Sequence, residues 1–268
     1  MEQVIFYLFI FIIGTVFGSF FTLAVYRIPL HQDITHERSY CPKCNHKLSF
    51  WDMIPIFSYI FLDGKCRYCK EKIRIRYLLL EILTGVVFLL FTMSINISFK
   101  TLEINKLIYL LFGFLYIIGM IIIAGIDKEK KTITKSVLIY EIIVVTAYIV
   151  YLYTVEKTNI YRYAIYLLMV FIFIIIENLY LKKKLKDNYT LQILELSMVM
   201  AIFTREITYV ATVILTLIII AIMQIKNKVL KNSDSKTKES YYLNIPFGFY
   251  LVCSNIISLI IVNFITCG

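Results

Sequence analysis

Residues 107–126 read LIYLLFGFLYIIGMIIIAGI, a run without a single charged side chain. At a rise of about 1.5 Å per residue, a helix of this length crosses the roughly 30 Å hydrocarbon core of a bilayer. The rest of the chain has the same character, with 60% of its 268 residues hydrophobic, 17% charged and a mean hydropathy of +0.78. A soluble domain needs more polar surface than this. The sequence therefore predicts an all-α polytopic membrane protein.

Other apolar runs of similar or slightly smaller length occur on both sides of this one. Together they predict eight transmembrane helices, near 4–25, 77–97, 107–126, 136–154, 160–181, 189–203, 207–225 and 244–265. Only Thr204, Arg205 and Glu206 separate the sixth run from the seventh, so a tight hairpin and one broken helix both remain open, and the count is eight or seven. Because residues 1–26 lack a basic start and a small-residue cleavage site, we interpret them as a permanent first helix.

The basic residues are concentrated in alternate loops. Of the 28 Lys and Arg residues, 23 lie in four loops, at 27–76, 127–135, 182–188 and 226–243. By the positive-inside rule these loops are cytoplasmic, which places both termini outside the cytoplasm for eight spans. A seven-span chain would move only the C-terminus inside. In a chain this apolar, the net charge of +10 indicates membrane topology and anionic lipid rather than nucleic acid.

Two C-x2-C pairs lie in the first of these loops. Four thiolates at this spacing complete a tetrahedral shell and predict a structural zinc site, with ligands Cys41, Cys44, Cys66 and Cys69. Two disulfides or four idle thiols are the alternatives, but disulfides are rare in a reducing compartment. Packing positions are expected for the remaining Cys253 and Cys267. We therefore expect three parts: a first helix at 1–26, a cytoplasmic zinc-binding module at 27–76 and a transmembrane domain at 77–268.

Several motifs around the cysteines occur in an order that matches a known family. They are GSFFTLAVYRIP (18–29), RSYCPKC (38–44), IPIFSY (54–59), GKCRYC (64–69), IRY (75–77) and Glu81. In this order they resemble the N-terminal half of bacterial type IV prepilin peptidases. Weaker matches follow at Gly125-Ile-Asp127 with Ile133, and at Ile245-Pro-Phe-Gly248. Thr134 stands where the family usually has proline.

The resemblance implies a membrane-embedded aspartic-type endopeptidase. Such enzymes remove the basic leader of prepilins or pseudopilins at the cytoplasmic face of the bacterial inner membrane, and many also methylate the new N-terminus with S-adenosylmethionine. The bilayer and the prepilin are the partners implied; the oligomeric state is not predicted. Methyl transfer rests on the resemblance alone, and Thr22 stands where the family commonly has asparagine.

The resemblance also implies two catalytic carboxylates, of which Asp127 is the first. The family's second aspartate follows a Gly-x-Gly motif, whereas this chain has Gln192-Ile-Leu-Glu195, with Ser197 in place of a lysine. We expect Glu195 in the place of the aspartate, and its extra methylene and the lost glycines change the geometry. Asp187 is the alternative second carboxylate. Glu195 lies inside a span, where an ionisable group usually faces a cavity or a partner.

Three hypotheses follow. The first is a prepilin peptidase that uses Asp127 and Glu195. The second is a catalytically silent relative that binds pilins or an assembly machine, suggested by complete cysteine motifs beside an eroded acid motif. The third is a zinc-ribbon membrane protein unrelated to pilins, which would make the ordered motifs accidental.

Overall fold

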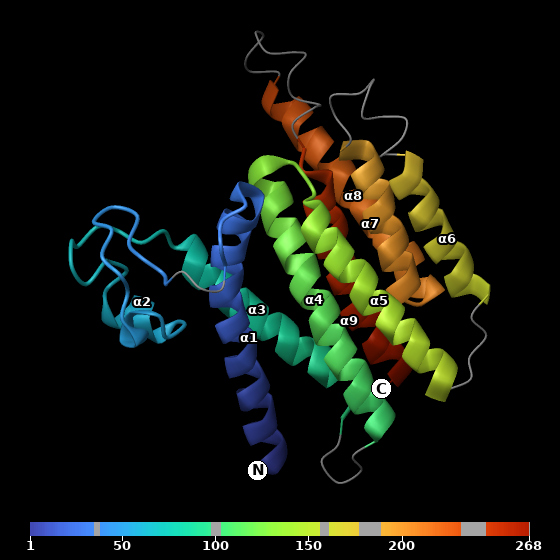
Figure 1. The fold of residues 1–268 in the computed structure, drawn as a ribbon, viewed down its shortest axis with the longest axis horizontal. Helices are drawn as coiled ribbons and strands as arrows, with labels where there is room; N and C mark the ends of the chain where they lie inside the picture. Colours follow the sequence, from blue (N-terminus) through green and yellow to red (C-terminus); the bar gives the residue numbers. More distant parts are fainter. Residues whose placement is uncertain (35–37, 98–102, 156–160, 177–188, 232–244, 268) are drawn as a thin grey trace. The chain divides into compact units, whose positions relative to one another are not determined.

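The computed structural model describes residues 1–34, 38–97, 103–155, 161–176, 189–231 and 245–267. Within these ranges the chain is helical and forms no strand, apart from two isolated β-bridges. Figure 1 follows the elements in chain order: α1 (Glu2–Arg27), η1 (Ile28–Leu30), η2 (Phe50–Asp52), α2 (Phe57–Phe61), α3 (Arg76–Ser94), α4 (Ile104–Lys130), α5 (Lys135–Val155), α6 (Tyr161–Ile176), α7 (Tyr189–Phe203), α8 (Glu206–Lys231) and α9 (Phe247–Cys267). The predicted all-α fold with a small module between its first two long helices is confirmed.

Six of the described helices are long and apolar enough to cross a membrane, namely α1, α3, α4, α5, α8 and α9. The chain is therefore a polytopic membrane protein. The helices α6 and α7 are apolar but shorter. At 15 residues, α7 is only about 22 Å long. The predicted number of eight spans is thus not confirmed, because six helices meet the criteria. The helices α6 and α7 remain predicted spans, and the predicted span of α6 extends beyond the described residues.

The break between α7 and α8 is a tight hairpin. The helix α7 ends at Phe203 and α8 begins at Glu206. The hydroxyl groups of Ser197 and Tyr209, twelve residues apart in sequence, lie 2.6 Å from each other. In one continuous helix they would be about 18 Å apart. Of the two arrangements left open by the sequence, the structure has the hairpin.

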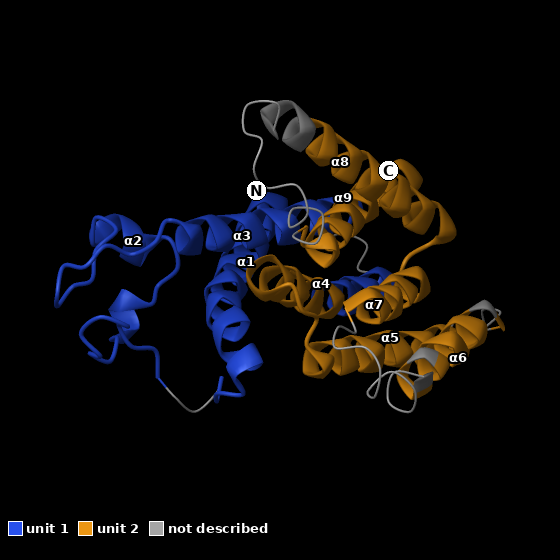
Figure 2. Ribbon diagram, turned by 90° about the horizontal axis from the view of Figure 1, so that it is seen from above, with its two compact units in different colours: residues 1–114, 267–268 blue, residues 115–266 orange. Residues whose placement is uncertain are grey.

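The chain divides into two compact units, residues 1–114 with 267–268, and residues 115–266 (Figure 2). In the first unit, α1 and α3 pack at glycine positions. A Cβ on Gly14 would lie 2.8 Å from the Cα of Gly85, and a Cβ on Gly18 would lie 2.7 Å from the Cα of Glu81. Gly14 and Gly18 form a G-x3-G pair, which lets helices in a membrane approach closely. The first two long helices are thereby fixed to each other.

Buried polar side chains connect three helices of the second unit. The hydroxyl of Tyr116 on α4 donates to Oδ1 of Asn255 on α9 at 2.7 Å. Nδ2 of Asn255 donates to Oγ1 of Thr212 on α8 at 3.2 Å. All three side chains are fully buried, where polar groups have no water and must satisfy one another. This network sets the register of α4 against α9.

Candidate functional site

Four cysteine sulfurs lie together in the module between α1 and α3. The Sγ atoms of Cys41, Cys44, Cys66 and Cys69 are all within 4.8 Å of one another, and none forms a disulfide. The 3.8 Å between Cys41 and Cys69 far exceeds the roughly 2.05 Å of a disulfide bond. Sulfurs around a tetrahedral zinc at about 2.3 Å are about 3.8 Å apart. The four thiols can hold one metal ion, and their arrangement is consistent with structural zinc.

The two cysteine pairs have the same backbone conformation. In each pair, the N–H of the first cysteine donates to the carbonyl five residues later, at 3.0 Å for Cys41 and 2.8 Å for Cys66. The residue after the second cysteine has a left-handed backbone, with φ of 56° at Asn45 and 59° at Lys70. Burial raises the pKa of Cys41, but hydrogen bonds from the backbone of the same pair outweigh it and lower the pKa to about 7. The thiolate of Cys41, which is the form that binds metal, is thus favoured. At Cys69 the backbone hydrogen bond of Glu71 lowers the pKa, but burial and hydrogen bonds with the other three cysteines outweigh it and raise the pKa to about 12.

An ion pair links the two halves of the module. Nε of Arg67 donates to Oδ1 of Asp52 at 2.6 Å, and the Asp52 side chain is almost fully buried. The other carboxylate oxygen caps η2 by accepting from the backbone N–H and the hydroxyl of Ser49, at 3.1 and 2.7 Å. Burial raises the pKa of Asp52, but the hydrogen bonds from Arg67 and Ser49 outweigh burial and hold the pKa below its usual value. Asp52 therefore fixes the second cysteine pair to η2.

The module is tied to the membrane helices of its own unit by Glu81. Oε2 of this α3 residue accepts the backbone N–H of Ile56 at 2.8 Å, and Ser19 of α1 also hydrogen-bonds to the carboxylate. Ile56 has φ of 62°, a strained conformation for a β-branched residue. The Glu81 carboxylate thus holds the loop that leads into α2 in this conformation.

In the second unit, Asp127 lies fully buried in the last turns of α4. Its Oδ2 accepts a 2.8 Å hydrogen bond from the backbone N–H of Phe249, in the first turn of α9. Gly248 leaves room for this approach, because a Cβ there would lie 3.1 Å from the same oxygen. Within the described part of the chain, Oδ1 has no hydrogen-bond partner. One carboxylate oxygen is therefore fixed at a helix N-terminus and the other remains available.

Tyr189, the first residue of α7, joins this site. Its hydroxyl accepts the backbone N–H of Gly248 at 3.2 Å and is also a hydrogen-bond partner of the Asp127 carboxylate. An amide can only donate, so the hydroxyl keeps its own proton for Asp127. A chain of hydrogen bonds thus runs from α9 through α7 to the carboxylate on α4.

Glu195 lies on α7 next to the face that contacts this region. Oε1 of Gln192 accepts the backbone N–H of Ile133 at 3.4 Å, in the connection between α4 and α5. Steps of three residues turn a helix by about 60°, so Tyr189 and Glu195 each lie within about 60° of Gln192. The Glu195 side chain is buried, with 1% exposed. The structure therefore puts a buried carboxyl two turns beyond Tyr189, on the helix that contacts Asp127.

Comparison with known proteins identifies the first unit. Residues 12–95 match the family model of the bacterial peptidase A24 N-terminal domain. The chain is 42% identical over 84 residues to a prepilin leader peptidase/N-methyltransferase of Myxococcus xanthus, and 35% identical over 150 residues to one of Vibrio cholerae. It is 34% identical over 131 residues to the protein of that name from Bacillus subtilis. Over these segments the chain is similar to prepilin leader peptidases, and the family model covers residues 12–95 alone.

The similarity to these prepilin peptidases is partial. The three alignments cover 31%, 44% and 49% of this chain, and 25%, 58% and 49% of the relatives' own lengths. No solved structure matches the chain. The matched domain contains the four cysteines and Glu81, whereas Asp127 and Glu195 lie outside residues 12–95.

Three further residues named in the sequence analysis are Asp187, Cys253 and Cys267. Asp187, the alternative second carboxylate, lies outside the described residues. Cys253 is a free, partly buried cysteine of α9. The side chain of Cys267 is not described.

Sequence reasoning assigned no functional role to Tyr189, Gln192 or Phe249. Tyr189 and Phe249 hydrogen-bond to Asp127, and Gln192 contacts the connection between α4 and α5. Two signals were available. The family-like motif Ile245-Pro-Phe-Gly248 carries no predicted role, but a proline and a glycine there mark the start of a helix with close backbone approach. Gln192 occupies the first position of the eroded glycine motif. Its amide binds the backbone of Ile133, an interaction that no local pattern predicts.

Proposed function

We propose that this chain removes the leader peptide of type IV prepilins or pseudopilins at the cytoplasmic face of the bacterial inner membrane. Asp127 is one catalytic carboxylate and Glu195 the other. The carrying observation is the buried Asp127 carboxylate, with one oxygen bound by the Phe249 amide and the other without a partner among the described residues. The names of the relatives support the substrate class.

The two carboxyl groups act on one shared water. Asp127 is the base, because an amide at a helix N-terminus stabilises its negative charge. It takes a proton from the water as the water oxygen bonds to the scissile carbonyl carbon, while protonated Glu195 donates a hydrogen bond to the carbonyl oxygen. The carbon–nitrogen bond then breaks, and the leaving amine takes the proton from Asp127. Tyr189 orients Asp127 and is a positioning residue.

The zinc module is a scaffold in this proposal. The four thiolates of Cys41, Cys44, Cys66 and Cys69 complete the coordination of one zinc ion, so no ligand position remains for water or substrate. The basic loops orient the chain with this module in the cytoplasm and both termini outside. The metal stabilises the fold of the loop and takes no part in peptide hydrolysis.

Methyl transfer to the new N-terminus is the second activity that the relatives' names support. It requires S-adenosylmethionine as the methyl donor, for which we assign no binding residue. Thr22, which stands where the family commonly has asparagine, donates its hydroxyl to the carbonyl of Ser19 at 2.7 Å. The side chain at this position is therefore engaged within its own helix.

The test is leader removal from a co-expressed prepilin in a host that lacks its own peptidase, read by gel shift and intact mass. We compare wild type with Asp127→Asn, Glu195→Gln and Glu195→Asp, after confirming equal amounts in the membrane. Glu206→Gln is the matched control, because Glu206 is an exposed carboxylate on α8. We expect cleavage by wild type, the control and Glu195→Asp, and none by the two isosteric amides. A further gain equal to one methyl group in the product mass reports methyl transfer.

Other outcomes separate the competing assignments. Full cleavage by Glu195→Gln removes Glu195 from the dyad, and Asp187→Asn then tests the alternative carboxylate. If wild type cleaves no prepilin from its own organism of origin but co-purifies with one, the result supports a catalytically silent relative that binds pilins.

A further inference from the structure

The zinc module carries an exposed set of large apolar side chains. Their exposed fractions run from 60% to 82%, and they come from η2 and α2: Phe50, Trp51, Phe57, Ile60 and Phe61. We call these five residues the apolar face. The rings lie in pairs, with centroids 5.9 Å apart for Phe50 and Trp51 and 6.4 Å apart for Phe57 and Phe61. Contiguous exposed apolar surface of this kind indicates an interaction site.

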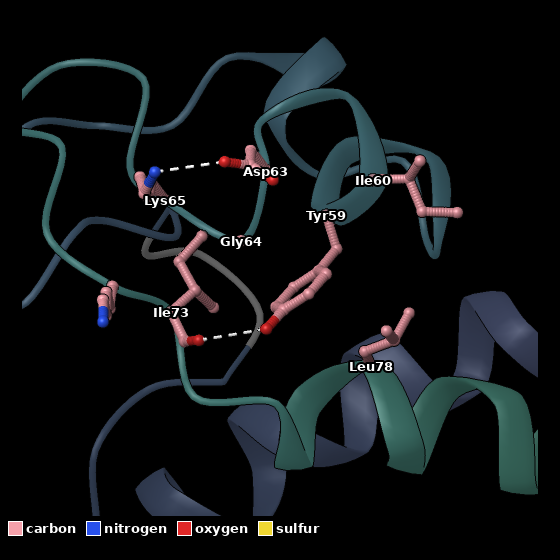
Figure 3. Close-up of a pocket in the computed structure, with 8 residues that line it drawn as sticks. Tyr59, Ile60, Asp63, Gly64, Lys65, Ile73 and Leu78 are labelled. Atoms are coloured by element: carbon pink, nitrogen blue, oxygen red, sulfur yellow. Dashed lines mark hydrogen bonds and ion pairs between the residues drawn. The ribbon is translucent and has the colours of Figure 1, made fainter.

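A pocket of about 420 Å³ adjoins this face. Figure 3 places Tyr59 and Ile60 of α2 on one side of it and Leu78 of α3 on another, with Lys65 on the opposite wall. The Tyr59 hydroxyl donates to the carbonyl of Ile73 at 3.3 Å. Because Ile60 belongs to both the apolar face and the pocket, the two features form one continuous surface.

The pocket also carries positive charge. Lys65, Lys72 and Asp63 line it, which leaves an excess of one positive charge, and the backbones of the two lysines face each other in an isolated β-bridge. Lys65 pairs with the highly exposed Asp63 at 3.1 Å, and Lys72 is exposed. Between residues 41 and 75 the chain has seven Lys and Arg residues and three Asp and Glu residues. The excess of four positive charges is larger than the net charge of −2 that a zinc ion bound by four thiolates would carry.

The connections of the module keep it at the bilayer. It lies between α1 and α3, which are both long and apolar enough to span a membrane. In Figures 1 and 2, α2 lies to the side of α1 and not beyond its end. A face of Trp and Phe rings with neighbouring lysines has the composition of an interfacial membrane anchor.

We propose that the apolar face inserts into the headgroup region of the bilayer, and that the pocket lined by Lys65 and Lys72 binds the phosphate of an anionic phospholipid. Lipid is the occupant that the charge favours, because two lysines repel a basic peptide and attract an anionic headgroup. A zinc ion bound by the four cysteines would fix the two cysteine pairs to each other, and Asp52, which pairs with Arg67 and caps η2, would then hold η2 against them.

The single tryptophan of the chain reports on this face directly, because Trp51 belongs to it. The experiment uses the full-length protein in vesicles of phosphatidylcholine and phosphatidylglycerol. Part of the lipid carries bromine at positions 6 and 7 of an acyl chain, which quenches a tryptophan at the headgroup boundary. Interfacial segments insert about 5–10 Å, so we expect bromine to lower the Trp51 emission by roughly half. Phe57→Ser/Phe61→Ser should lose most of this quenching.

A matched pair of lysines tests the pocket. Lys47 and Lys72 both lie six residues after the first cysteine of their pair and both form an isolated bridge, with Tyr40 and Lys65 respectively. Only Lys72 lines the pocket. We expect Lys72→Glu to abolish the increase in quenching that phosphatidylglycerol gives over phosphatidylcholine, and Lys47→Glu to retain most of it. Zinc content, measured for each variant, separates a lost surface from an unfolded module.

Two results would overturn the proposal. One is wild-type Trp51 emission at the wavelength of a water-exposed indole, with no quenching by brominated lipid. The other is quenching that appears equally in wild type and in the Phe57→Ser/Phe61→Ser variant with zinc retained. Protection of Trp51 by an added prepilin, in lipid that does not quench it, would assign the surface to a protein partner.

Discussion

The backbone N–H of Phe249 donates a 2.8 Å hydrogen bond to Oδ2 of Asp127, across 122 residues of chain. The contact places the carboxylate against the first turn of α9, where unpaired amides and the helix dipole favour negative charge. It depends on the absence of a side chain at Gly248, since Cβ there would lie 3.1 Å from Oδ2 and 3.2 Å from Cγ of Asp127. The proposed catalytic geometry therefore rests on a glycine as much as on an acid.

Gly248→Ala should displace the Asp127 carboxylate by a few tenths of an ångström and loosen its bond to Phe249. A displacement of about 1 Å costs roughly a hundredfold in rate, so we expect leader cleavage to slow by roughly tenfold. Single-turnover cleavage in detergent measures the effect. Phe249→Leu is the control, because it keeps the backbone N–H and should retain most activity. Unchanged cleavage by Gly248→Ala would contradict a strict need for this contact.

Cys66→Ser should release the metal from the module. Removal of one of four thiolates opens the coordination shell, so we expect the zinc content of the purified chain to fall from about one ion to a small fraction. Elemental analysis of the purified membrane protein gives the number. Cys253→Ser, which alters a thiol outside the cluster, should leave the content unchanged. Equal loss in both variants would place the metal elsewhere.

Asp52→Asn should weaken the module in a pH-dependent way. The hydrogen bonds from Arg67 and Ser49 hold the folded pKa of Asp52 below its unfolded value of about 3.9. A lowered folded pKa gives stability that is fully present above the unfolded pKa and is lost as the pH falls through the folded pKa. The melting temperature reported by Trp51 should therefore differ between wild type and variant at pH 7 and at pH 5.5 alike. The difference should shrink only below about pH 4.

Much of this fold could be predicted because its signals are local. Apolar runs predict helices, and each C-x2-C spacing brings its own two sulfurs together, so Cys41, Cys44, Cys66 and Cys69 could be predicted as one metal site. The short α7 shows the limit. Thr204 and Arg205 were enough to predict a break in the helix. A hydropathy pattern does not predict the contact between Ser197 and Tyr209, which shows that the break is a hairpin.

The surroundings of Asp127 could not be predicted for a different reason. The family resemblance of Gly125-Ile-Asp127 marked it as a candidate, but its partners come from helices that begin 62 and 120 residues later, at Tyr189 and Phe247. Which amide or hydroxyl reaches the carboxylate depends on the packing of α4, α7 and α9. A single sequence gives the apolar character of those helices and not their relative rotation.

Asn255→Ala should destabilise the second unit. It removes the acceptor of the Tyr116 hydroxyl and the donor to Thr212, and leaves both groups buried. Hydrogen bonds between membrane helices contribute about 0.6 kcal/mol on average, and an unsatisfied buried group costs about 1–3 kcal/mol. We expect a loss of about 1–2 kcal/mol in the free energy of unfolding, followed by circular dichroism in mixed detergent. Thr146→Ala, whose hydroxyl bonds only to the carbonyl of Ile142 in its own helix, should cost less.

Gly119→Ala should be tolerated only when Glu141 is shortened. Glu141 on α5 is fully buried and its Oε1 packs against the position that a Cβ on Gly119 would occupy. The added methyl group must displace the carboxyl, and overpacking of this kind costs about 1–3 kcal/mol. In Gly119→Ala/Glu141→Ala the methyl fills space that the shorter side chain leaves. The double variant should therefore unfold at a higher denaturant concentration than Gly119→Ala. Strict additivity of the two single effects would mean that the contact is absent in the folded protein.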